Sequence, residues 1–82
     1  MTIAVLHTIS DPAKFFAAAG QADSVGLPAG FKLRVQSRTA DRSRSITFWE
    51  APSVEALRQL VESVIGAYSS NEYIEMEMHI NG

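Results

Sequence analysis

The sequence predicts an α+β sandwich in which a four-stranded antiparallel sheet carries two helices on one face. Three observations predict it. The length of 82 residues suits one domain, residues 1–82, because domains usually hold about 100–150 residues. A composition of 46% hydrophobic and 20% charged residues suits a packed core. Along the chain, apolar residues recur with the periods of strand, helix, strand, strand, helix and strand in turn.

The first part of the chain predicts a buried strand and a helix. Residues 2–9, TIAVLHTI, are rich in β-branched side chains and apolar on both faces, which is typical of a central strand. Ser10, Asp11 and Pro12 form a helix start, because side-chain oxygens cap the first amides and proline needs no donor there. The helix then carries apolar residues at helical spacing, namely Phe15, Phe16, Ala19 and Ala22, until the loop at 26–30.

The middle of the chain predicts a hairpin with strands at 31–38 and 45–50. In both strands apolar and polar residues alternate, which indicates one buried and one exposed face. We expect the helices to cover the apolar stripe, which comprises Phe31, Leu33, Val35, Ile46 and Phe48. The opposite face then receives Lys32, Arg34, Arg38, Ser45, Thr47 and Trp49.

The last part predicts a second helix and a final strand. Ser53 caps the helix, and apolar residues then step by three and four from Val54 to Tyr68. The final strand is expected at 73–80. Its helix-facing residues are predicted to be Ile74, Met76, Met78 and Ile80, and its other face to hold Tyr73, Glu75, Glu77 and His79.

This order of elements predicts the ferredoxin-like βαββαβ sandwich, with strand order 4-1-3-2, because crossover connections are right-handed. One sheet face is then left without helices. The first strand contributes alternate residues to that face, and both sets are open: Ile3, Val5, His7 and Ile9, or Thr2, Ala4, Leu6 and Thr8.

The uncovered face predicts a homodimer. A face with Trp49 and Tyr73 is too apolar to be left in water, and a chain this small gains stability from self-association. Two sheets packed about a two-fold axis bring the basic second strand of one subunit near the acidic fourth strand of the other. The expected interface residues are Lys32, Arg34, Arg38, Trp49, Glu75 and Glu77.

Residues 48–57, FWEAPSVEAL, join the third strand to the second helix. With the βαββαβ order, this segment resembles the small dimeric α+β-barrel proteins, and most closely a family of unknown function that includes a nickel-binding protein. The resemblance implies the fold, the dimer and a divalent metal such as nickel held by a histidine late in the first strand. His7 matches that histidine, whereas Ala4, Val5 and Leu6 precede it in place of the family's acidic residue.

Four residues are candidates for a ligand site on the uncovered face, namely His7, Trp49, Tyr73 and Glu75. Antiparallel pairing predicts that Tyr73 and Glu75 lie beside His7 and that His79 lies near Ile3. His7 and Glu75 could then ligate a metal, or His7 could act as a general base. Trp49 and Tyr73 could line a pocket for a planar ligand. The structural alternative is that these residues only pack and hydrogen-bond at an interface.

These residues favour a small homodimeric binding or accessory protein. The alternative, which the resemblance implies, is a cofactor-independent monooxygenase or cyclase acting on an aromatic or polyketide-like substrate. An RNA-binding module shares the topology and the basic second strand, but residues 44–49 lack its glycine-aromatic run, so we expect no nucleic-acid partner. There is no cysteine, no apolar stretch of ~20 residues and no secretory signal. We therefore expect a cytoplasmic protein without a membrane partner.

Overall fold

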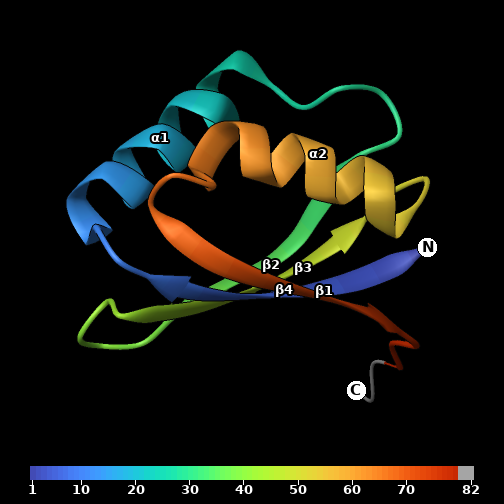
Figure 1. Cartoon of the computed structure of the whole chain (residues 1–82). Helices are drawn as coiled ribbons and strands as arrows, with labels where there is room; N and C mark the ends of the chain where they lie inside the picture. The colour runs from blue at the N-terminus through green and yellow to red at the C-terminus, as the bar shows by residue number, and fades with distance from the viewer. Residues whose placement is uncertain (80–82) are drawn as a thin grey trace.

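The computed structural model describes residues 1–79, and its six elements follow the predicted order (Figure 1). They are β1 (Thr2–Ile9), α1 (Pro12–Val25), β2 (Lys32–Arg38), β3 (Arg44–Glu50), α2 (Val54–Ile65) and β4 (Ser69–Met76). The strands form one antiparallel sheet in the order β2-β3-β1-β4, and both helices lie over the same face (Figure 1). The predicted ferredoxin-like α+β fold is therefore confirmed.

Both helices begin at the predicted capping residues. The Asp11 carboxylate accepts a hydrogen bond from the Lys14 amide at 3.2 Å, and the Ser53 hydroxyl accepts one from the Ala56 amide at 3.0 Å. From α2, Leu57, Val61 and Ile65 are buried against the sheet. In the part of the chain that the structure describes, neither helix is long and apolar enough to cross a membrane.

The register of the sheet decides which residues of β1 face the helices. Ile3, Val5 and Ile9 belong to the core together with Leu57 of α2, so the odd-numbered positions of β1 lie under the helices. The even-numbered positions, Thr2, Ala4, Leu6 and Thr8, therefore belong to the face without helices, which we call the open face.

The prediction for β3 was wrong, because the structure exchanges the two predicted faces of this strand. Trp49 lies opposite Ile3 in the sheet, and cross-strand partners share a face. Trp49 is consequently buried under the helices, together with Thr47, rather than placed on the open face. Phe48 takes the open face instead, so that face does carry one aromatic residue on its third strand.

A β-bulge reverses the faces within β2. The register shifts between Leu33, which pairs with Trp49, and Val35, which pairs with Phe48. Leu33 therefore faces the helices and Val35 the open face, although the sequence pattern places them together. Beyond the bulge Arg38 pairs with Ser45, which puts Arg38 on the helix side and not on the open face as expected.

The final strand begins and ends four residues before its predicted limits. The carbonyl of Tyr68 accepts hydrogen bonds from the amides of Ser10 at 2.9 Å and Asp11 at 3.3 Å. These bonds tie the end of β1 to the start of β4, so Ile9 pairs with Ser69. The predicted faces are reversed as a result: Tyr73 and Glu75 lie on the helix side, and Ile74 and Met76 on the open face.

The end of the expected strand also differs. Glu77, Met78 and His79 follow β4 without belonging to it, and His79 does not pair with Ile3. Ile80 lies outside the described residues.

The open face is the more apolar face of β3 and β4. Its larger exposed apolar side chains have between 36% and 48% of their surface in contact with solvent, namely Val35, Ile46, Ile74 and Met76. We define the open-face patch as these four residues together with Ala4, Leu6 and Phe48.

Candidate functional site

A cleft of about 870 Å³ lies between the two helices and the sheet. Its volume falls within the range of known small-molecule pockets, roughly 300–1,000 Å³. Most of its lining is apolar, with Phe15, Phe16 and Ala19 from α1, Leu33 and Trp49 from the sheet, and Val61 from α2. The site thus lies on the helix side of the sheet and not on the open face where the sequence predicted it.

The floor of the cleft carries a chain of hydrogen bonds that crosses two strands. The indole N–H of Trp49 donates to the Thr47 hydroxyl oxygen at 2.8 Å. The same oxygen lies 3.0 Å from Nε2 of His7. A hydroxyl can donate one hydrogen bond and accept two, so the tautomer of His7 decides the direction of this bond.

The chain continues from His7 to β4 and α2. Nδ1 of His7 lies 2.6 Å from Oδ1 of Asn71, and Nδ2 of Asn71 donates to Glu62 at 2.8 Å. A carboxylate can only accept, so the amide nitrogen of Asn71 faces Glu62 and its oxygen faces the imidazole. His7 therefore carries its proton on Nδ1 and uses Nε2 as an acceptor.

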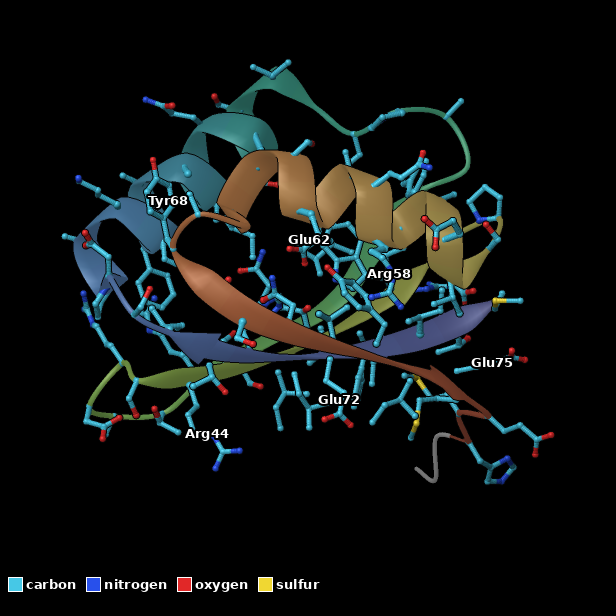
Figure 2. The ribbon with its side chains drawn as sticks, in the orientation of Figure 1. Arg44, Arg58, Glu62, Tyr68, Glu72 and Glu75 are labelled. Carbon is cyan, nitrogen blue, oxygen red and sulfur yellow. The ribbon has the colours of Figure 1, made fainter. Side chains whose placement is uncertain are left out.

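Tyr73 of β4 joins the same hydrogen-bond network at Glu62 of α2. The hydroxyl of Tyr73 donates to Glu62, and the guanidinium of Arg58 lies 4.6 Å from the centre of the Tyr73 ring. Figure 2 shows Arg58 and Glu62 between α2 and β4. Burial and the hydrogen bond to Glu62 raise the pKa of Tyr73 above its ordinary value, so its phenol stays protonated.

His7 is a neutral imidazole in this setting. Only 4% of its surface is exposed, and its ring meets the edge of Phe15 at a centroid distance of 5.4 Å. Burial lowers the pKa of His7, and this effect outweighs the opposing influences of Asn71 and Glu62. A ligand that displaces the Thr47 hydroxyl would therefore meet an unprotonated base in the cleft.

The predicted site residues are brought together only in part. His7 and Trp49 both line the cleft and are joined through Thr47. Tyr73 is connected to His7 by hydrogen bonds that pass through Glu62 and Asn71. Glu75 pairs with Ile3, four positions along β4 from Asn71, which is a separation of about 13 Å along the strand.

The expectation that Tyr73 and Glu75 flank His7 was therefore wrong. Asn71 occupies that place because β4 begins at Ser69. Within residues 1–79 no group of three or more His, Cys, Asp or Glu side chains is placed to hold a metal ion. Both ring nitrogens of His7 already have hydrogen-bond partners.

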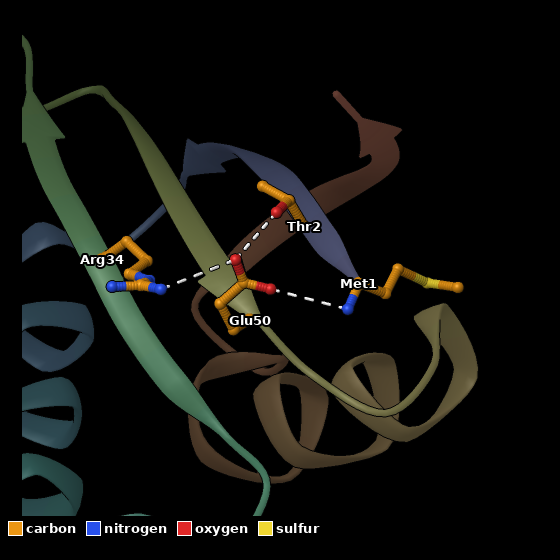
Figure 3. A network of polar contacts seen from close by, with 4 residues as sticks. All are labelled: Met1, Thr2, Arg34 and Glu50. Carbon is orange, nitrogen blue, oxygen red and sulfur yellow. Dashed lines mark hydrogen bonds and ion pairs between the residues drawn. The ribbon is translucent and has the colours of Figure 1, made fainter. Parts of the chain in front are cut away.

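The predicted interface residues do not share one face of the sheet. Lys32 pairs with Glu50 on the open face, whereas Trp49, Arg38 and Glu75 lie on the helix side. Arg34 lies 3.8 Å from Glu50, which also binds the Thr2 hydroxyl at 2.9 Å and the N-terminal amine at 3.5 Å (Figure 3). Within one chain, then, Arg34 is already near a carboxylate.

Three residues of the site were missed by sequence reasoning, namely Thr47, Glu62 and Asn71. One signal could have placed His7 correctly. The odd positions of β1 hold three large apolar residues, Ile3, Val5 and Ile9, whereas Leu6 is the one large apolar residue at the even positions of β1, which favours the odd set for the core. Nothing in the sequence pattern distinguishes Glu62 or Asn71 from ordinary surface residues.

Comparison with known proteins found no match to a family model, to a curated protein or to a solved structure. The resemblance to the dimeric α+β-barrel proteins therefore stays a prediction.

Proposed function

We propose that the protein is a homodimer that binds a small organic molecule in the cleft beside His7. The observation that carries the proposal is the cleft, which combines apolar walls with a hydrogen-bonded polar floor. Pockets for small molecules have this composition, because apolar walls provide affinity and a few polar groups provide orientation. The role we propose is that of a binding or accessory protein.

A neutral fluorescent probe tests the cleft. Phenylnaphthylamine, which brightens in apolar surroundings, is titrated into the wild-type protein and into Ala19→Phe, which places a ring in the cleft. We expect saturable binding to the wild type and loss of binding in the variant. Ala17→Phe is the matched control, because Ala17 is exposed on the same helix and does not line the cleft. Equal binding by all three proteins would contradict the proposal.

The open-face patch supports the homodimer. It places four large apolar side chains on a sheet face that no element of residues 1–79 covers. Apolar patches of this kind on small proteins mark interaction sites, because water is a poor solvent for them. A second copy offers the same flat apolar surface under two-fold symmetry.

Sedimentation velocity at micromolar concentration tests the dimer. We expect a particle of 17.8 kDa, twice 8.9 kDa, for the wild type. Ile46→Glu puts a charge in the middle of the patch and should yield the 8.9 kDa chain. Gln21→Glu adds the same charge to the exposed surface of α1 and should remain dimeric. A wild type that sediments as one chain refutes the dimer.

An enzymatic role is the second candidate, and the His7–Thr47 pair favours it. The unprotonated Nε2 of His7 lies at the floor of the cleft and could take a proton from a phenolic substrate. Oxygen uptake with anthrone as the probe tests this, with anthrone and dioxygen yielding anthraquinone and water. His7→Gln should abolish any uptake above the buffer rate. If the wild type consumes no oxygen above the buffer rate, the enzymatic role is refuted and the binding role remains.

Metal binding requires a rearrangement, because Thr47 and Asn71 occupy the two ring nitrogens of His7. Thermal melting with nickel chloride tests it directly. A melting temperature that rises with nickel in the wild type and not in His7→Gln would favour a metal site over an organic ligand.

A further inference from the structure

Two arginines, Arg38 and Arg42, lie beside the ring of Phe16, and both Phe16 and Arg38 line the cleft. The guanidinium carbon of Arg38 lies 5.4 Å from the centre of that ring, and that of Arg42 lies 5.9 Å from it. Both side chains are exposed, and among residues 1–79 neither has a carboxylate within ion-pair distance. Two cations beside one ring without a counter-ion create a positive potential that attracts an anion.

The hairpin loop holds Arg42 in this position. The backbone φ of Arg42 is 62°, in the left-handed region that residues other than glycine rarely adopt. The Asp41 carboxylate accepts hydrogen bonds from the Thr39 and Ser43 hydroxyls, both at 2.7 Å, and from the Ser43 amide at 3.0 Å. These bonds fix the turn, and they direct the Asp41 carboxylate to donors of the loop itself. Unfavourable backbone conformations that are held in this way often belong to functional sites.

The interior of the cleft offers no comparable charge. In the described part of the chain, every buried side-chain nitrogen or oxygen already has a hydrogen-bond partner. A ligand body that lies on the floor therefore needs no polar groups of its own. Asp23 lines the cleft seven residues further along α1 than Phe16, about 10 Å away, and would repel an anion from that end.

We infer that the cleft binds an amphiphilic organic anion, with its acidic group at Arg38 and Arg42 and its apolar body along β3. This inference rests on the proposed binding function. The floor runs from Ser45, which pairs with Arg38, through Thr47 to Trp49. Four residues of strand span about 13 Å, which leaves room for a flat body of two or three rings.

Two dyes with the same apolar body test the inference. Anilinonaphthalene sulfonate is an anion, and phenylnaphthylamine is its neutral counterpart. We expect the wild type to bind the sulfonate about tenfold more tightly, the factor that two partly exposed ion pairs provide. The double variant R38Q/R42Q should bind both dyes equally. R44Q is the matched control, because Arg44 lies in the same hairpin but pairs with Thr8 on the open face (Figure 2).

Salt gives a second measurement that needs no variant. Binding of the sulfonate should weaken as ionic strength rises, whereas binding of the neutral dye should not. Equal affinities of the wild type for the two dyes, or an equal loss of sulfonate affinity in R44Q, would overturn the anion inference while leaving the cleft intact. Absence of binding by both dyes would instead overturn the proposed function.

Discussion

Replacing Thr47 by valine should destabilise the protein more than its small change in volume suggests. Valine has nearly the shape of threonine, but it lacks the hydroxyl that bonds Nε2 of His7 at 3.0 Å and the indole N–H of Trp49 at 2.8 Å. Two largely buried polar groups lose their partner at once. An unsatisfied buried group costs about 1–3 kcal/mol, and water from the cleft can relieve part of that cost. We therefore expect a loss of about 2–3 kcal/mol.

That loss is a large part of the total stability. An 82-residue domain is stable by roughly 4–12 kcal/mol, at 0.05–0.15 kcal/mol per residue. For a chain of this size 1 kcal/mol shifts the melting temperature by about 4–8 °C, so Thr47→Val should melt roughly 10–20 °C below the wild type. Thermal unfolding followed by circular dichroism at one fixed protein concentration measures this. Thr8→Val is the control, because Thr8 is an exposed threonine of β1.

A double-mutant cycle separates the hydrogen bonds from simple loss of packing. His7→Leu removes the acceptor, so Thr47→Val should cost less in that background than in the wild type, by about 1 kcal/mol. Additive losses would show that the two side chains are not coupled. A Thr47→Val protein that melts within about 2 °C of the wild type would refute the whole chain of hydrogen bonds.

Three further predictions concern pH, the core and a helix cap. Because burial lowers the pKa of His7, the unfolded chain takes up a proton before the folded chain as the pH falls. The contribution of His7 to the free energy of unfolding, measured in urea, is therefore fully present above a pH of about 6.5 and declines below it. His7→Gln should remove that decline. Leu57→Ala, at a position with 0% exposure, should cost about 2–5 kcal/mol in the same assay. Ser53→Ala should cost about 0.5–2 kcal/mol, because it removes the acceptor for the Ala56 amide; an unchanged urea midpoint would contradict the cap.

Much of the fold could be predicted because local signals and the apolar pattern agree. Asp11 and Ser53 cap the helices as expected, and the elements follow one another in the predicted order. The strand order then follows from the handedness of the crossovers. These features depend on neighbours along the chain, which the sequence displays directly.

The site could be predicted only in part, because it depends on the faces of the strands. The assumption that the helices cover the most apolar stripes misplaced Trp49 and Tyr73. The structure turns Ile46 and Ile74 outward instead and reserves the helix side for Thr47 and its hydrogen-bonded partners. That assumption holds only for a chain that buries all its apolar surface by itself.

By itself, the sequence determined the element order, the helix starts and the alternation within β1, β3 and β4. Alternation with a period of two states which residues share a face, but not which face lies under the helices. The tertiary structure decided that second question through three long-range features: the bonds from Ser10 and Asp11 to Tyr68, the bulge between Leu33 and Val35, and the pairing of Ile3 with Trp49. A shift of one residue at any of them exchanges the two faces of the strand concerned.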